Sequence, residues 1–277
     1  MKKVLTLIVT AMLAVIFAVG MTACGKKDAY KAVEMKGVSP ESYGFAVKKG
    51  ENANILAACN KVIASEGFGA IVDELVEYYT VVYGEEKPEA LSFNLPDLSD
   101  NTAGTLKVGT EAGFAPFEFA SNSYGIDGVA GLDVAIMMFV AEELNYKLQI
   151  VDMSFDSLPA ALTSGQIDII AAGFTNNAER AEKMDFSANY FTSKQYIVCA
   201  NDASYETVED LKGLKIAVQL GTTGDFLISD EIDDGALKGS GAECVQYKSI
   251  TLAMSALKKG DIDVIVVDEL PAKTLVK

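Results

Sequence analysis

The chain has 277 residues, enough for one or two domains, and a formal net charge of −16. This acidity argues against binding to nucleic acids or to anionic lipid surfaces. There is no His in the sequence, which excludes His-based triads and His-ligated zinc. Cys59, Cys199 and Cys244 lie far apart and lack metal-ligand spacing, so we expect free thiols and no metal or cofactor, with a Cys199–Cys244 bridge as the alternative.

The first 23 residues have the pattern of a secretory signal. Lys2 and Lys3 precede an apolar run over residues 4–20, and small residues follow before Cys24. The run is short for a membrane helix, which needs about 20 apolar residues. A Cys in the first mature position resembles a lipoprotein signal, which implies lipidation of Cys24. Residues 24–29 would then be a tether, and the protein would lie on the extracellular face of the cell membrane.

The next part of the chain contains two predicted strands, two predicted helices and a linker. Alternation predicts strands at residues 30–35 and 43–47. Apolar residues at helical spacing predict one helix from residue 52 to a break at Gly67, and a second through residues 71–79. Residues 83–104 are polar and interrupted by prolines, which indicates a linker.

Beyond residue 104, predicted strands and helices alternate along the chain. The strands are expected at residues 105–110, 147–151, 167–172, 196–200, 215–219 and 264–267. The helices are expected at 131–144, 157–163, 178–184, 250–258 and 269–276, and two more are expected to begin at 208–211 and 223–228. This alternation indicates an α/β fold with mainly parallel sheets.

Five motifs in order carry a family resemblance. They lie at residues 109–119 (GTEAGFAPFEF), 155–168, 171–187 (beginning AAGFT), 218–224 (VQLGTTG) and 260–268. Together they resemble the polar amino-acid-binding proteins, the family 3 type of solute-binding lipoprotein, of ABC importers. Residues 39–81 resemble the last strand and helices of the same family, although they stand near the beginning of this chain.

The resemblance implies a two-lobed, type II periplasmic-binding-protein-like α/β fold that is circularly permuted. The family's old termini would be joined by residues 83–104. Lobe 1 would contain residues 45–82 and 105–190, lobe 2 would contain 30–41 and 195–277, and the hinges would lie near 42–44 and 191–195.

The resemblance also implies a ligand site between the lobes, with no catalytic residues. Its members would be Glu111, Phe114, Phe155, Ala172, Gly173, Thr175, Arg180, Gln219, Thr222, Thr223 and Asp268. Arg180 suits the ligand carboxylate because a guanidinium binds a carboxylate with two parallel hydrogen bonds. Asp268 suits the buried ammonium, and it could cap the helix that follows, in place of that role or together with it.

The remaining predicted site residues have roles taken from the resemblance. Gly173 and Thr175 would share the carboxylate, and the two threonines of the VQLGTTG motif would close on it. Phe114 and Phe155 would sandwich the ligand side chain, unless they belong to the core. Glu111 and Gln219 would touch that side chain, unless Glu111 points to solvent. Ala172 stands where some relatives have Ser, so a hydroxyl contact would be absent there.

The expected function is therefore a monomeric receptor that delivers a polar L-amino acid to an ABC permease by hinge closure. The motifs resemble the arginine-binding members most, with glutamine and cystine binders as competitors. An enzyme similar to the cyclohexadienyl dehydratases, and a sensor domain with a separate partner, are alternatives on the same fold. A further alternative is that two chains exchange segments.

Overall fold

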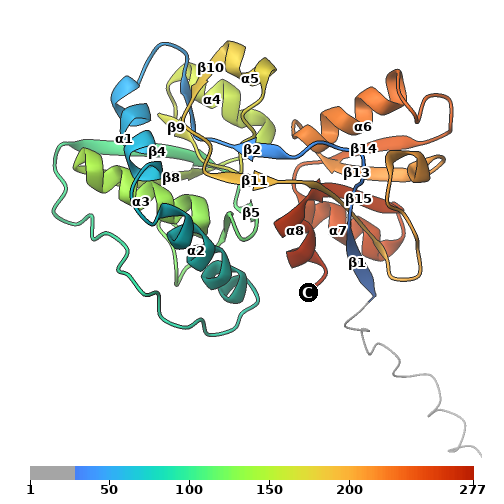
Figure 1. Ribbon diagram of the computed structural model, residues 1–277, viewed down its shortest axis with the longest axis horizontal. Helices are drawn as coiled ribbons and strands as arrows, with labels where there is room; N and C mark the ends of the chain where they lie inside the picture. The colour runs from blue at the N-terminus through green and yellow to red at the C-terminus, as the bar shows by residue number, and fades with distance from the viewer. Residues whose placement is uncertain (1–28) are drawn as a thin grey trace, which may run out of the picture.

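The structure, a computed structural model, describes residues 29–277, so the predicted signal and Cys24 lie outside the described residues. It has two lobes, each built around a five-stranded sheet and covered by helices (Figure 1). The predicted α/β architecture with two lobes is confirmed. Cys59, Cys199 and Cys244 are free thiols, as expected.

The sheet of lobe 1 has the order β10-β3-β9-β4-β8. β4 runs parallel to β8 and β9, whereas β3 is antiparallel to β9 and β10. These strands are β3 (Ala46–Lys48), β4 (Gly104–Thr110), β8 (Tyr146–Asp152), β9 (Ile169–Ile170) and β10 (Met184–Phe186). The predicted strand at residues 167–172 is thus only two residues long.

Five helices cover the sheet of lobe 1. α3 is buried on nearly every side because apolar residues surround its axis, and α1 and α2 pack against it. The helices are α1 (Ala53–Ile63), α2 (Phe68–Tyr83), α3 (Leu132–Leu144), α4 (Leu158–Ser164) and α5 (Ala178–Lys183). The sequence did not predict the small sheet of β5 (Gly113–Phe114), β6 (Glu118–Ala120) and β7 (Val129–Ala130) in this lobe.

The sheet of lobe 2 has the order β1-β12-β15-β13-β14. β1, far from the others in sequence, is its edge strand and pairs antiparallel with β12, Glu34 opposite Tyr196. The strands are β1 (Tyr30–Glu34), β12 (Gln195–Ala200), β13 (Lys215–Gln219), β14 (Glu243–Tyr247) and β15 (Val264–Asp268). The helices are α6 (Thr223–Asp233), α7 (Ile250–Lys259) and α8 (Glu269–Leu275).

Two predictions for lobe 2 need correction. β14 was not predicted, because its five residues lie at the sheet edge and are mostly half-exposed. The predicted helix at residues 208–211 is a single 3-10 turn, η2 (Val208–Leu211), which ends before β13 begins. Its carboxylate at Asp210 and hydroxyl at Thr207 form a capping box around that one turn.

Two short antiparallel strands cross between the lobes, β2 (Glu41–Tyr43) and β11 (Phe191–Ser193) (Figure 1). The prediction of one strand over residues 43–47 is wrong. The chain leaves β2 after Tyr43 and enters the lobe 1 sheet as β3, so the two halves of this segment pair with different strands. The change of sheet at Gly44 and Phe45 places Glu41 between the lobes.

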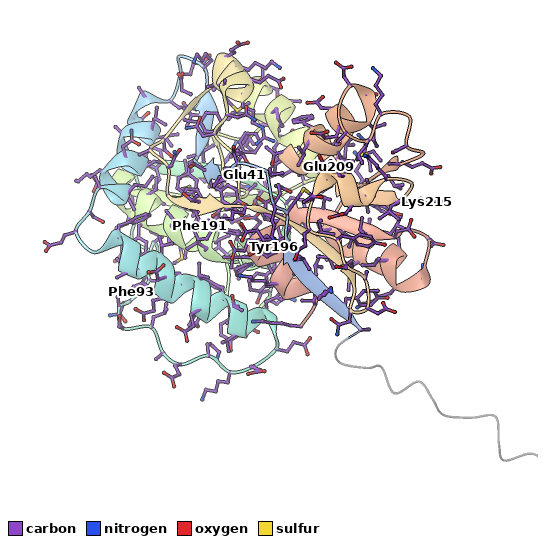
Figure 2. The ribbon with its side chains drawn as sticks, turned by 45° about the vertical axis from the view of Figure 1, so that its right-hand side comes forward. Glu41, Phe93, Phe191, Tyr196, Glu209 and Lys215 are labelled. Atoms are coloured by element: carbon purple, nitrogen blue, oxygen red, sulfur yellow. The ribbon has the colours of Figure 1, made fainter. Side chains whose placement is uncertain are left out.

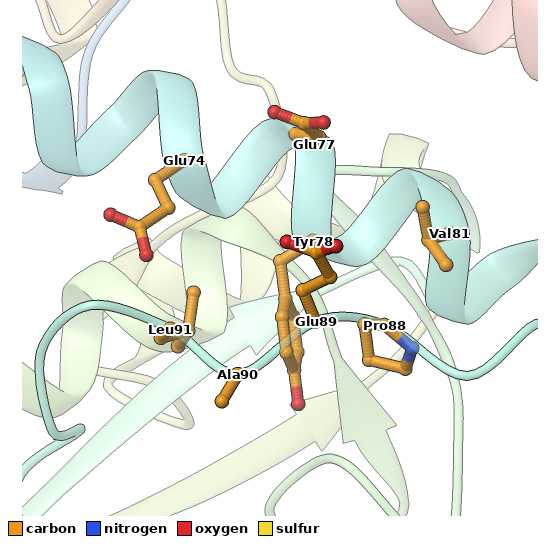
Figure 3. A pocket seen from close by; sticks show the side chains of 8 residues that line it. All are labelled: Glu74, Glu77, Tyr78, Val81, Pro88, Glu89, Ala90 and Leu91. Carbon is orange, nitrogen blue, oxygen red and sulfur yellow. The ribbon is translucent and has the colours of Figure 1, made fainter.

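Residues 84–103, which we call the strap, contain no helix or strand and lie along the outside of lobe 1. Glu74 on α2 holds the strap by accepting hydrogen bonds from the amide and the hydroxyl of Ser92. Phe93 of the strap packs near Phe139, with ring centroids 6.1 Å apart. A cavity of about 160 Å³ lies between α2 and residues 88–91 (Figure 3).

Among residues 29–277, no single helix is both long enough and apolar enough to span a membrane. Only α1 and α2 taken together reach that length and hydropathy, and their axes are bent by 89° relative to each other.

Candidate functional site

The predicted site residues converge where the two lobes meet, a region we call the lobe junction. In each lobe, loops at the carboxyl ends of parallel strands supply the side chains, the usual place for a ligand in α/β sheets. Contacts already join the lobes here: Lys248 forms an ion pair with Asp156 at 2.8 Å, and the Gln219 amide donates to Glu111 at 3.0 Å. The structure is therefore that of closed lobes.

Arg180 on α5 is buried at the lobe junction and is 8% exposed. Its guanidinium lies over the ring of Phe174 at 4.0 Å and donates to the carbonyl of Thr175 at 3.0 Å and of Gly221 at 3.1 Å. Burial lowers the pKa of Arg180 to about 10, while the negative charges of Glu41 and Asp268 oppose that shift. The guanidinium is thus cationic at neutral pH and bridges both lobes.

The loop after β9 contains Gly173 and Thr175 and places Thr175 at the junction. Thr175 donates its hydroxyl to Glu41 at 2.5 Å. The amide of Gly173 donates to the buried carboxylate of Asp133 at 2.9 Å. This N–H group is therefore not free to bind the ligand carboxylate, which differs from the role expected for Gly173. Gly173 has a φ of +52°, and a Cβ there would come within 2.8 Å of Phe114, so only glycine fits this turn.

Ala172 and the two predicted phenylalanines are buried. Ala172 is 1% exposed in an apolar cluster that also contains Phe155, so its side chain belongs to the core. Phe155 lies 5.6 Å from the Arg180 guanidinium, and Phe114 lies against Gly173. Phe155 therefore borders the cationic end of the site, and Phe114 lies beside the Gly173 turn.

The two threonines at the start of α6 have different tasks. The hydroxyl of Thr222 accepts from the amide of Asp225 and donates to the carbonyl of Gln219, so it caps the helix. Thr223 donates its hydroxyl to Glu41 at 2.7 Å. The structure therefore brings the Thr223 hydroxyl to the lobe junction, whereas that of Thr222 serves the fold.

Glu111 follows β4 and points into the junction rather than to solvent, with 8% exposure. Burial raises the pKa of Glu111 to about 7, opposed by the hydrogen bond from Gln219. Gln219 is itself 2% exposed and also donates to the carbonyl of Lys248. This pair can accept from, or donate to, a polar ligand side chain.

Asp268 ends β15 and stands at the first position before α8, but its side chain makes no capping hydrogen bond. It is 6% exposed, and its Oδ1 has no hydrogen-bond partner. Burial and then the charge of Glu41 raise its pKa well above the ordinary value. The alternative role as a helix cap is thus not the one this side chain performs.

Sequence reasoning missed Glu41, which lies at the centre of the junction (Figure 2). Its carboxylate accepts from Thr175 and Thr223 through Oε2, and from the Gln195 amide through Oε1 at 2.6 Å. These donors come from lobe 1, from the start of α6 and from the start of β12. The only signal in the sequence was that residue 41 directly precedes a predicted crossing.

A buried acidic pair behind the site was also missed. Asp133 at the start of α3 accepts from the Tyr190 hydroxyl at 2.7 and 2.8 Å as well as from Gly173. Burial raises the pKa of Asp133 to about 7, and these donors oppose the rise. Glu118 is fully buried with both oxygens unpartnered, and burial raises its pKa well above the ordinary value. Asp133 thereby fixes the Gly173 turn.

No group of three or more Cys, Asp or Glu side chains arranged to hold a metal ion occurs within residues 29–277.

Glu111→Gln is expected to stabilise the protein at pH 8 but not at pH 5. An unfolded Glu loses its proton near pH 4.3, whereas folded Glu111 keeps it to about pH 7. Between these values the folded state binds more protons, so this group lowers stability as pH rises. The gain at pH 8 should be about 1–3 kcal/mol in the free energy of unfolding, measured in urea. Glu243→Gln, on an exposed edge strand, is the control, and an equal effect of Glu111→Gln at both pH values would contradict the prediction.

The family model for bacterial extracellular solute-binding proteins, family 3, matches residues 106–264. A probable histidine-binding protein of Campylobacter jejuni is 37% identical over 62% of this chain and 63% of its own length. The arginine-binding extracellular protein ArtP of Bacillus subtilis is 36% identical over 45% of this chain and 47% of its own. The chain thus spans less than two thirds of these curated relatives.

A solved structure of an ancestral arginine-binding protein bound to arginine is also similar. It has 36% sequence identity and a TM-score of 0.57, covering 62% of this chain and 74% of that one. The family match covers more than half of the chain and contains the loops that form the lobe junction from Glu111 to Thr223. The chain belongs to the family 3 bacterial extracellular solute-binding proteins.

Proposed function

We propose that this protein is an extracellular receptor that binds a polar L-amino acid and delivers it to the permease of an ABC importer. The observation that carries the proposal is the buried Arg180, held between the lobes beside Thr175 and near Asp268, whose Oδ1 has no hydrogen-bond partner. A guanidinium and a carboxyl group at one buried site suit the carboxylate and the ammonium of an amino-acid backbone. The names of its relatives, which bind histidine, arginine or cystine, support this role.

The ligand side chain would meet Glu111 and Gln219. An ionised Glu111 suits a guanidinium or an ammonium, and a neutral one suits an amide, because a protonated carboxyl both donates and accepts. The pKa of Glu111 lies at about 7 without a ligand, so the positive side chain of a bound arginine would favour the ionised form of Glu111. Arginine is therefore the first candidate, before glutamine and cystine.

The chain order would be a circular permutation of the family's order. Lobe 1 would comprise residues 45–82 and 105–190, and lobe 2 residues 30–41 and 195–277, with residues 83–104 joining the family's old termini. The position of β1 in the lobe 2 sheet, the packing of α1 and α2 in lobe 1, and a family match that begins only at residue 106 support this proposal. The permuted order requires that α2 stabilises lobe 1, and the substitution Leu75→Ala tests this requirement.

Cys24 would carry a lipid that anchors the receptor to the outer face of the cell membrane, with residues 24–29 as the tether. The signal-like run and the Cys that follows it support this placement. The receptor would act as a monomer, with one chain supplying the strands of both lobes. Mass spectrometry of the protein purified from membranes would detect the diacylglyceryl group on Cys24, and an intact signal peptide would contradict the anchor.

Isothermal titration calorimetry of residues 25–277 against the twenty amino acids and cystine tests the function. We expect a single site with one polar amino acid preferred, arginine first. The absence of binding for every compound would overturn the receptor proposal. Preference for an apolar amino acid would instead overturn the role given to Glu111 and Gln219.

A further inference from the structure

Glu41 collects hydrogen-bond donors from both lobes onto one carboxylate. Oε2 accepts from the hydroxyls of Thr175 and Thr223, and Oε1 accepts from the amide of Gln195. A carboxylate offers about four acceptor positions, so these three bonds leave one position free on Oε1. The three donors fix that oxygen in space.

Asp268 lies beside this carboxylate. Asp268 on β15 stands directly opposite Gln195 on the neighbouring strand β12. Side chains of residues that stand opposite each other in a sheet lie on the same face. Because Gln195 also bonds Glu41, both carboxyl groups flank one amide. Asp268 is 6% exposed, and its Oδ1 is buried without a partner. The negative charge of Glu41 contributes to the raised pKa of Asp268, which agrees with this closeness.

Within residues 29–277, no Lys or Arg forms an ion pair with either carboxyl group. Arg180 is the cation at the junction, but its guanidinium donates to the carbonyls of Thr175 and Gly221. Two adjacent buried carboxyl groups that no cation contacts directly are costly, because each must be paired or neutralised. A compact cation with several N–H donors would satisfy both.

We propose that Glu41 and Asp268 together bind the primary ammonium group of the ligand. This inference rests on the proposed function and adds Glu41 as a residue that determines specificity. The three donors of an –NH₃⁺ group reach the free position on Glu41 Oε1 and the unpartnered Oδ1 of Asp268 at once. Compounds that carry the carboxylate but lack the ammonium would leave these oxygens unpaired and would bind poorly.

Glu41 could alternatively take the place of the ligand carboxylate when no ligand is bound, as a stand-in that competes with the ligand. Such a stand-in would lie on the guanidinium, which binds carboxylates with two parallel bonds. The Arg180 N–H groups instead point to two backbone carbonyls, and the donors on Glu41 are two hydroxyls and an amide. The contacts therefore favour the ammonium role.

The test compares two probes, L-arginine and its desamino analogue 5-guanidinopentanoic acid, by calorimetry and by displacement of L-arginine. The proteins are the wild type and Glu41→Gln, with Glu34→Gln as the matched control on the exposed end of β1. We expect Glu41→Gln to weaken L-arginine about 10- to 100-fold and the analogue less than about 3-fold. The ratio of the two affinities should therefore fall, and the control should keep the wild-type ratio.

A general structural defect would weaken both probes equally and leave the ratio unchanged, which would overturn the inference. Tighter binding of L-arginine by Glu41→Gln would also overturn it, because it would identify Glu41 as a competitor. If Glu41→Gln does not fold, Glu41→Asp keeps the charge and should show a smaller fall in the same ratio. If the wild type prefers another amino acid, that compound and its desamino analogue replace the pair. A wild type that binds no amino acid would overturn the proposed function together with this inference.

Discussion

Arg180→Ala is expected to remove most amino-acid binding, with a loss of about 2–5 kcal/mol of affinity. Arg180 is the buried cation that would pair with the ligand carboxylate, and Ala leaves that carboxylate without a charged partner. The guanidinium also connects Thr175 in lobe 1 to Gly221 in lobe 2, so its loss should make closure less favourable. Calorimetry with the preferred amino acid measures the effect.

Lys183→Ala is the matched control for this substitution. Lys183 lies on the same helix, but it is exposed and pairs with Glu179, so affinity should change little. Circular dichroism must show that both variants are folded. Binding by Arg180→Ala at wild-type strength would mean that the ligand carboxylate lies elsewhere.

Leu75→Ala is expected to lower the free energy of unfolding by about 2–5 kcal/mol. Leu75 is fully buried on α2, in the same apolar cluster as residues of α3 and β4 that come much later in the chain. Removing its side chain leaves a cavity that the packed helices can fill only partly. Urea denaturation measures the change.

The exposed Glu77, two residues further along α2, provides the control, and Glu77→Ala should change stability by less than about 0.5 kcal/mol. If Leu75→Ala behaved like this control, α2 would not be a stabilising part of lobe 1. The proposed permuted order would then lose its main physical support.

The long elements were predictable because their apolar spacing is unambiguous. α1, α2 and α7 each bury a regular set of side chains, α3 is apolar nearly all round, and the strands β13 and β15 are mostly apolar. Their order also told which loops follow strands, and so which residues reach the lobe junction. Arg180, Thr175, Thr223 and Asp268 were predicted from the family resemblance, and this order of strands and loops agrees with their positions.

What sequence reasoning missed depends on contacts between distant segments. β5, β6 and β7 have two or three residues each, too few to show a period. Whether Thr222 or Thr223 faces the junction depends on the residue at which α6 begins, because the capping hydroxyl is used locally. Glu41 gave no signal beyond its place before a predicted crossing, since its donors lie more than 130 residues away in the sequence.

The pairing of β1 with β12 also affects how the protein can fold during synthesis. Glu34 pairs with Tyr196 and Val47 with Asp185, so the first strands to leave the ribosome must wait for partners made much later. Contacts of such large sequence separation slow folding because a long loop must close first. Neither lobe can complete its sheet on the nascent chain until most of the protein exists. Export in an unfolded state would therefore be favoured by the order of the strands themselves.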